Sequence, residues 1–109
     1  MIQKTVNPRV RARQDIDEAL DFYLREASER AALGFIDAVE RAFRAIARTP
    51  AAGSPRHAYE LGLPGLRHWP LRRYPYLVFY VEQQDHIDVW RVLHAQRDIP
   101  AWMTIPDDS

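Results

Sequence analysis

The feature that most constrains the fold is a run of six apolar and aromatic residues, YLVFYV, at positions 76–81. The run is too short to span a membrane, and its β-branched and aromatic side chains are typical of a strand. Successive side chains of a strand point to opposite faces. One face carries Tyr76, Val78 and Tyr80, and the other carries Leu77, Phe79 and Val81. The sequence therefore predicts an interior strand of a sheet that is covered on both sides.

Two further strands are predicted beside this one. Residues 87–93 follow a turn at 82–85 and alternate along the chain. Strict alternation places Ile87, Val89, Arg91 and Leu93 on one face, and Asp88, Trp90, Val92 and His94 on the other. Residues 66–73 form the preceding strand, where Pro70 indicates an edge or a break because proline cannot donate a ladder hydrogen bond. We therefore expect three consecutive antiparallel strands.

The first half of the chain predicts a short strand and two amphipathic helices. Residues 2–6 alternate like a half-buried strand. Two apolar stripes follow at spacings of three and four: Ile16, Ala19, Leu20, Tyr23, Leu24 and Ala27, then Ala32, Phe35, Ile36, Val39, Phe43 and Ile46. Acids crowd the early part of the first helix, Asp15 among them, and the helix dipole would favour them there if that helix begins late. Almost no loop separates the helices, which indicates an antiparallel αα-hairpin.

Local signals predict where these helices begin and end. Asn7 with Pro8 is interpreted as an N-cap followed by proline at the first helical position, and Ser28 as the N-cap of the second helix. Pro50 ends the second helix, because the residue before proline disfavours helical geometry. Gly34 lies inside the second helix, where it costs about 1 kcal/mol relative to alanine. We attribute this glycine to close approach of the two helices.

These elements predict an α+β fold in the order β-α-α-β-β-β. An N-terminal strand and an αα-hairpin pack on an antiparallel sheet, because the apolar stripes of the hairpin need a partner and one face of the sheet is the only candidate. We expect residues 1–109 to form one domain, with a core at about 2–100 and a short tail at 101–109.

Composition excludes several classes of function. The sequence has no cysteine, which rules out disulfides and cysteine-based metal sites and suits a reducing cytoplasm. No apolar run is long enough to span a membrane. The formal net charge of +0 argues against a nucleic-acid coating protein, so we expect no direct, stable nucleic-acid binding. The four histidines lack metal-ligand spacing, and we predict neither a metal nor a cofactor.

A polar cluster follows the last predicted strand and consists of Arg91, His94, Arg97 and Asp98. One interpretation is an RNA-cleaving site in which His94 acts as a general base. The other is a recognition or structural role, since a single histidine at a strand end more often makes a structural hydrogen bond. On that interpretation Arg91 with Asp98, and Arg67 with Glu82, form ion pairs that say little about function.

The order of these elements resembles the RelE/ParE superfamily of toxins from type II toxin–antitoxin systems. The segments that carry the resemblance are residues 46–50 with Gly53 after them, 65–67, 78–80, and 91–94 followed by Arg97 and Asp98. No single segment is specific, but the set in this order and spacing is. The resemblance extends over nearly the whole chain and implies the fold described above.

The RelE-like branch cleaves mRNA on the ribosome, usually with lysine and arginine on the sheet and a tyrosine or histidine near the C-terminus. In this chain the only lysine is Lys4, no tyrosine follows Tyr80, and Leu77 stands where that branch tends to carry a basic residue. If the chain is nevertheless such a nuclease, its catalytic residues would be Arg67, Arg73, Arg91, His94 and Arg97.

The chain is more similar to the ParE-like branch, on residues 91–94 followed by Arg97 and Asp98. That resemblance implies a cytoplasmic toxin, not an enzyme, that inhibits growth by binding and poisoning DNA gyrase. It implies a ParD-like antitoxin that folds on binding, and a toxin–antitoxin hetero-oligomer. The predicted partner-binding residues are Arg67, Trp69, Arg91, His94, Arg97 and Trp102. A third hypothesis is a degenerate, non-toxic homologue that only binds its antitoxin, and the fold alone does not separate the three.

Overall fold

The computed structural model describes residues 3–96, 99 and 103. Its elements in chain order are β1 (Thr5–Pro8), α1 (Val10–Glu26), α2 (Glu29–Arg48), the 3₁₀ turn η1 (Pro50–Ala52), α3 (Arg56–Leu61), β2 (Leu66–Pro70), β3 (Tyr76–Glu82) and β4 (His86–His94). This is the predicted α+β order, to which the segment between α2 and β2 adds η1 and α3. Within the described residues, no helix has both the length and the apolar character needed to cross a membrane.

The four strands form one mixed sheet in the order β1-β4-β3-β2. The strands β2, β3 and β4 are antiparallel neighbours, as predicted. The strand β1 joins the other side of β4 and runs parallel to it. Consequently β3 lies in the interior of the sheet, while β2 is an edge strand that ends at Pro70.

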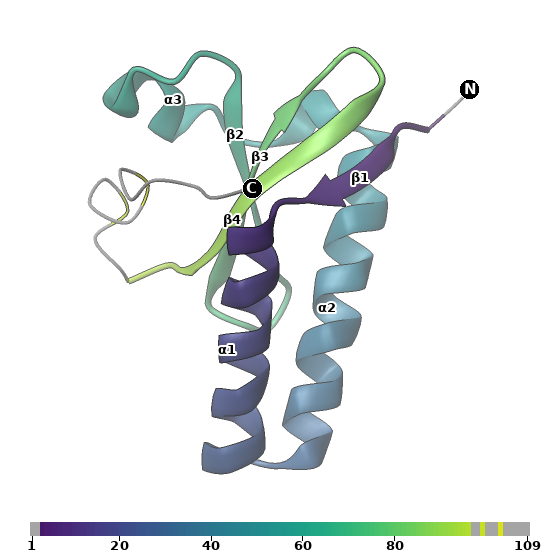
Figure 1. The fold of residues 1–109 in the computed structure, drawn as a ribbon, viewed down its shortest axis with the longest axis vertical. Coiled ribbons are helices and arrows are strands. Elements are labelled where there is room, and N and C mark those ends of the chain that lie inside the picture. Colours follow the sequence, from purple (N-terminus) through teal and green to yellow (C-terminus); the bar gives the residue numbers. More distant parts are fainter. Residues whose placement is uncertain (1–2, 97–98, 100–102, 104–109) are drawn as a thin grey trace.

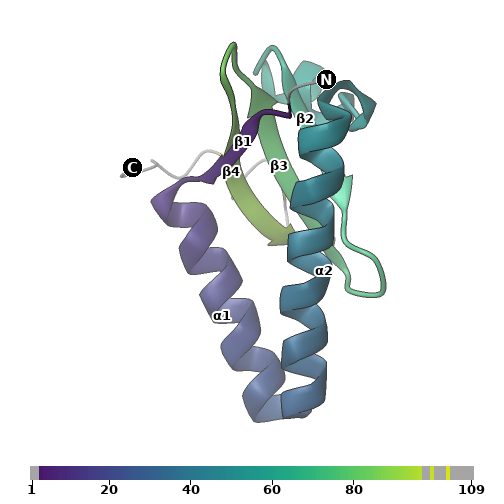
Figure 2. The same cartoon turned by 90° about the vertical axis from the view of Figure 1, so that its right-hand side faces the viewer.

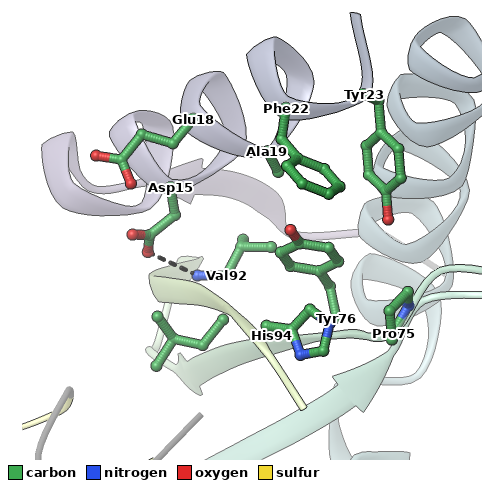
Figure 3. Close-up of a pocket in the computed structure, with 10 residues that line it drawn as sticks. Asp15, Glu18, Ala19, Phe22, Tyr23, Pro75, Tyr76, Val92 and His94 are labelled. Carbon is green, nitrogen blue, oxygen red and sulfur yellow. Dashed lines mark hydrogen bonds between the residues drawn. The ribbon is translucent and has the colours of Figure 1, made fainter. Parts of the chain in front are cut away.

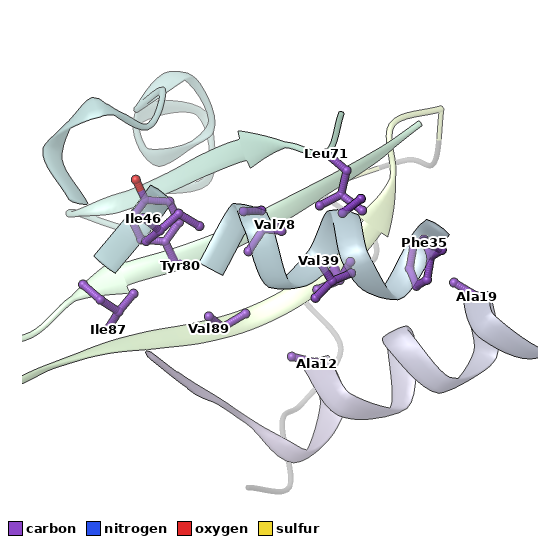
Figure 4. Packing of buried hydrophobic residues seen from close by; sticks show 13 residues of the cluster. Ala12, Ala19, Phe35, Val39, Ile46, Leu71, Val78, Tyr80, Ile87 and Val89 are labelled. Carbon is purple, nitrogen blue, oxygen red and sulfur yellow. The ribbon is translucent and has the colours of Figure 1, made fainter. Parts of the chain in front are cut away.

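Side chains cover the sheet on both faces. The helices α1 and α2 run side by side as a hairpin across one face (Figures 1 and 2). The larger hydrophobic cluster lies between this hairpin and the sheet and includes Phe35, Val39, Ile46, Val78 and Tyr80 (Figure 4). A smaller cluster, formed by Leu66, Phe79, Leu93 and Ile99, packs against Ala58 and Leu61 of α3. The prediction that residues 76–81 are covered on both faces is therefore confirmed.

The start of α1 differs from the prediction. Pro8 is the last residue of β1, and the N-cap of α1 is Arg9, whose side chain makes no cap hydrogen bond. The Arg9 amide donates a hydrogen bond of 2.9 Å to the Val89 carbonyl. This bond extends the contact with β4 by one residue beyond Pro8, so the backbone stays extended through Arg9 before it turns into the helix. Ser28 caps α2 as predicted, because its hydroxyl accepts a hydrogen bond from the Ala31 amide.

Gly34 allows a contact other than the predicted one. A Cβ atom at this position would overlap the hydroxyl of Tyr74, which belongs to the loop between β2 and β3. The same hydroxyl donates a hydrogen bond of 2.8 Å to the Ala31 carbonyl. The close approach at Gly34 is therefore between α2 and a loop, and not between the two helices.

The strict alternation predicted for β4 is wrong beyond its middle. The ladder between β3 and β4 shifts its register between Phe79 and Tyr80. A bulge of this kind adds one residue to a strand and reverses the faces of the residues that follow. Val92 therefore lies in the larger cluster together with Ile87, while Leu93 lies in the smaller one.

Candidate partner-binding site

A concave site of about 350 Å³ lies between α1 and the adjoining ends of β3 and β4 (Figure 3). We call it the α1 groove. From the helix it is lined by Asp15, Glu18, Ala19, Phe22 and Tyr23, and from the sheet and its preceding loop by Pro75, Tyr76, Val92, Leu93 and His94.

The helical wall of the α1 groove follows from the periodicity of α1. Its five residues recur at steps of three and four, which places them on one face of the helix. Ala19 is buried and small, and so lets the helix lie close to the sheet. Phe22 follows almost one turn later and remains 47% exposed. A half-exposed aromatic ring at a concave site is the kind of residue that protein interfaces enrich.

A buried ion pair joins α1 to β4 at this groove. The Asp15 carboxylate accepts hydrogen bonds from Arg91 Nε at 2.7 Å and Arg91 Nη2 at 2.8 Å. It accepts a third from the Val92 amide at 3.0 Å (Figure 3). The side chains of Arg91 and Asp15 are only 6% and 8% exposed. Arg91, predicted as a catalytic or partner-binding residue, thus binds α1 through a buried pair whose charges compensate each other.

Sequence reasoning did not identify the role of Asp15, which it assigned to the helix dipole. The helix begins at Val10, so Asp15 lies beyond its first turn. The available signal is positional, because Asp15 interrupts a stripe of buried residues between Ala12 and Ala19. A carboxylate on the buried face of a helix needs a partner, and Arg91 is the only charged residue within the apolar run 89–93 of the last strand.

An aromatic cluster backs the α1 groove. The ring of Tyr23 lies 5.2 Å from that of Tyr74 and 5.5 Å from that of Phe35, and Phe35 lies 5.3 Å from Tyr76. Burial raises the pKa of Tyr23, and the neighbouring phenols of Tyr76 and Tyr74 raise it further. The Tyr23 hydroxyl is therefore protonated at neutral pH, and this part of the groove is uncharged.

His94 lines the same groove at the end of β4. Its ring packs edge-on against Tyr76 at 5.2 Å, and its Nδ1 accepts a hydrogen bond of 3.1 Å from the Gln96 amide. An Nδ1 that accepts from an amide is unprotonated in this arrangement. These contacts hold the imidazole in place beside the groove.

Of the other predicted site residues, those that the structure describes do not line the α1 groove. Arg67 donates a hydrogen bond of 2.7 Å to the Gly53 carbonyl, and Trp69 packs partly buried against the larger cluster. Arg73 lies exposed in the loop between β2 and β3. Arg97, Asp98 and Trp102 lie outside the described residues.

One ion pair inferred from the sequence is replaced by another. Glu82, expected to pair with Arg67, instead accepts a hydrogen bond of 2.8 Å from Lys4. The parallel addition of β1 to β4 places Thr5 opposite His86, and so brings Lys4 close to the turn that follows β3. Pairing across the sheet could not be deduced without this strand order.

The α1 groove offers a binding surface more than a set of catalytic groups. Most of its lining is apolar or aromatic, and no lysine or arginine of the described chain lines it. Cleavage of a phosphodiester requires cationic groups where negative charge develops. In the described residues no three histidine, cysteine or acidic side chains are grouped to hold a metal ion. The groove suits apolar side chains of a protein partner.

Comparison with known proteins identifies a similar fold and a family. No curated protein matches the chain. A solved structure described as "Chromosomal ParDE TA system from P. aeruginosa" is similar, with a TM-score of 0.72 and 19% sequence identity, over 86% of this chain and 98% of that chain. At this identity the similarity establishes the fold. The family model described as "ParE toxin of type II toxin-antitoxin system, parDE" matches residues 6–99. Because this match spans most of the sequence, the chain belongs to the ParE toxin family of type II toxin–antitoxin systems.

Proposed function

We propose that this chain is a cytoplasmic toxin that inhibits growth by binding and poisoning DNA gyrase. Its membership of the ParE family supports this function. The observation that carries the proposal is that the Arg91 guanidinium is engaged inside the fold. Its Nε and Nη2 donate hydrogen bonds to the buried Asp15 carboxylate. A guanidinium held in this way supports the fold and is poorly placed to stabilise a transition state at the surface. The proposed toxin therefore acts by binding and is not an enzyme.

We also propose that a ParD-like antitoxin neutralises the toxin by folding into the α1 groove. A disordered segment that orders on binding buries its apolar side chains in such a groove. Phe22 and Tyr76 offer aromatic surface there, and His94, one of the predicted partner-binding residues, lines it. The contacts of Arg67 and Trp69 are internal, so in this proposal they support the fold.

The first test measures the affinity of the toxin for the antitoxin encoded by the neighbouring gene. Replacing Phe22 with alanine should weaken this binding about tenfold or more, since buried aromatic anchors dominate interface energies. Leu24→Ala is the matched control, because Leu24 is 49% exposed on the same helix but does not line the groove. Equal losses in the two variants would refute the α1 groove as the antitoxin site.

The second test compares gyrase and ribosome as targets. Purified toxin should inhibit supercoiling by gyrase and accumulate cleaved DNA, while leaving mRNA intact in a translation extract. Ribosome-dependent mRNA cleavage would instead support the nuclease hypothesis with Arg67, Arg73, Arg91, His94 and Arg97. If antitoxin binds and neither assay responds, the chain is a non-toxic homologue.

A further inference from the structure

A second concave site, of about 320 Å³, lies between α2 and the loop that joins β2 to β3. This loop curves back beside α2 in Figure 2. The site is lined by Gly34, Asp37, Ala38, Arg41, Arg72, Arg73 and Tyr74. We call it the arginine groove, because three of these seven residues carry a guanidinium group.

The loop that forms one wall of the arginine groove is held in a defined conformation. The Tyr74 hydroxyl donates to the Ala31 carbonyl of α2 at 2.8 Å, in space that only a glycine at position 34 leaves open. The Leu71 amide donates to the Tyr76 carbonyl at 2.9 Å and closes the base of the loop. Arg73 has a φ of 72°, a conformation that costs energy for a residue with a Cβ. The glycine within α2 and the positive φ of Arg73 are each locally unfavourable. Both are present in the conformation that holds the loop against α2.

The charges of the arginine groove are not balanced. Arg41 pairs with Asp37 at 2.9 Å, and both side chains are more than half exposed. Within the described residues, neither Arg72 nor Arg73 takes part in an ion pair. Three arginines against one aspartate leave an excess of two positive charges in a concave site with a fixed wall.

We propose that the arginine groove binds acidic side chains of a polypeptide partner. Guanidinium groups bind carboxylates through paired hydrogen bonds, and a rigid loop lowers the entropy lost when they do so. The site goes beyond the proposed function, because it depends neither on the target of the toxin nor on what occupies the α1 groove.

The surroundings favour a polypeptide over DNA as the source of the negative charge. The chain has a formal net charge of +0, and the neighbouring helix α1 exposes Asp17, Glu18 and Asp21. A DNA duplex needs an extended cationic surface to release its counterions, and these acids oppose one. The arginine groove places its three guanidinium groups around a hollow, with small Gly34 and Ala38 and the ring of Tyr74 beside it. This size and polarity suit one or two carboxylate side chains.

Asp37 would compete with an acidic ligand for Arg41. Its carboxylate already neutralises Arg41, so an incoming acid must either displace it or use Arg72 and Arg73. Replacing Asp37 with asparagine removes the competing charge and keeps the shape of the side chain. The proposal therefore predicts that Asp37→Asn strengthens the binding of an acidic ligand, by about threefold, since exposed ion pairs are weak.

The test uses a fluorescein-labelled peptide of glutamate residues as the probe, with anisotropy measured on the full chain at low ionic strength. The double variant Arg72→Ser with Arg73→Asn removes two charges, and asparagine tolerates the positive φ. We expect it to weaken peptide binding about tenfold, through the loss of two charge-assisted contacts. The matched control, Arg44→Ser with Arg48→Asn, removes two exposed arginines of α2 outside the groove and should change binding less than about twofold.

Equal weakening by the two double variants would overturn the proposal, because it would show an effect of net charge alone. Weaker peptide binding in Asp37→Asn would also overturn it. A short DNA duplex of equal charge serves as the comparison probe, and tighter binding to DNA through Arg72 and Arg73 would assign the groove to nucleic acid instead. Urea unfolding of each variant confirms that the comparison is made between folded proteins.

Discussion

The two faces of the sheet are closed by different means. The face under the α1–α2 hairpin holds the larger cluster (Figure 4). At its edge the Asp15 carboxylate of α1 accepts three hydrogen bonds. The face under α3 holds the smaller cluster and two imidazole rings, those of His57 and His68, whose centroids lie 5.1 Å apart. Within the described residues, the Nδ1 atoms of both histidines are buried and have no hydrogen-bond partner.

The buried ion pair on one side and the two histidines on the other predict that the two sides respond differently to substitution and to pH. A buried polar atom without a partner lowers the free energy of unfolding by about 1–3 kcal/mol. A buried ion pair is tolerated only while both partners are present, because removing one leaves an uncompensated buried charge. Removing one partner of the ion pair should therefore cause a large loss in the free energy of unfolding. Changes on the α3 face should cause smaller losses, which should depend on pH.

The largest effect is expected from breaking the ion pair on the hairpin face. Asp15→Asn leaves the buried Arg91 guanidinium uncompensated and should lower the free energy of unfolding by about 3–5 kcal/mol, measured by urea denaturation. Asp17→Asn, an exposed acid of the same helix, is the control and should change it by less than about 0.5 kcal/mol.

A double variant sharpens this prediction. Asp15→Leu with Arg91→Met removes both charges and should regain much of the loss, since apolar replacements of a buried pair are often tolerated. If Asp15→Asn alone costs less than about 1 kcal/mol, the hairpin face does not depend on this pair in the way proposed.

Replacing Gly34 should have a smaller effect on stability, and its sign should depend on the residue at position 74. In the natural sequence Gly34→Ala displaces the Tyr74 hydroxyl from Ala31 and should destabilise the chain by about 1 kcal/mol. In a Tyr74→Phe background the obstructing oxygen is absent, and the same change should stabilise by up to about 1 kcal/mol through helix propensity. Thermal unfolding of the four members of this cycle measures the coupling, and purely additive effects would contradict the contact.

The smallest effect is a pH dependence confined to the α3 face. Burial lowers the pKa of His68, and the positive charges of His57 and Arg56 lower it further. The unfolded chain then binds the proton more tightly, so the stability is intact well above about pH 6.5 and decreases as the pH falls below it. Glu60 lies 3.6 Å from His57 Nδ1 and partly offsets the positive charge.

Unfolding free energies measured between pH 8 and pH 5, about the range in which histidine titrates, check this direction. His68→Phe should flatten the decrease, whereas His86→Phe should not, because His86 pairs with the exposed Asp85 outside the α3 face. A decrease that persists in His68→Phe would assign the pH dependence to other groups.

The fold was largely predictable because its signals are local. The apolar residues at 76–81 predict a doubly covered strand, the two stripes predict the hairpin, and Ser28 and Pro50 bound α2. The prediction for the start of α1 failed because the parallel ladder to β4 extends the chain through Arg9. Alternation in β4 failed because a bulge depends on the partner strand, which no local pattern encodes.

The candidate sites were less predictable, because they are made by residues far apart in the sequence. His94 was identified and lines the α1 groove, but Phe22 and Tyr23 looked like ordinary members of an apolar stripe. The arginine groove joins α2 to a loop more than thirty residues later, and among its arginines the sequence singled out only Arg73.

By itself, the sequence determined the type and order of every element except η1 and α3, and the superfamily they resemble, since these depend on periodicity, turn residues and the spacing of short segments. Only the tertiary structure decided that β1 runs parallel to β4 and that Arg91 pairs with Asp15, 76 residues away. The physical reason is that the burial of a charge and its compensation are properties of the packed chain. An arginine that reads as part of a surface cluster in the sequence becomes, once α1 lies on β4, the buried counter-charge of a helix.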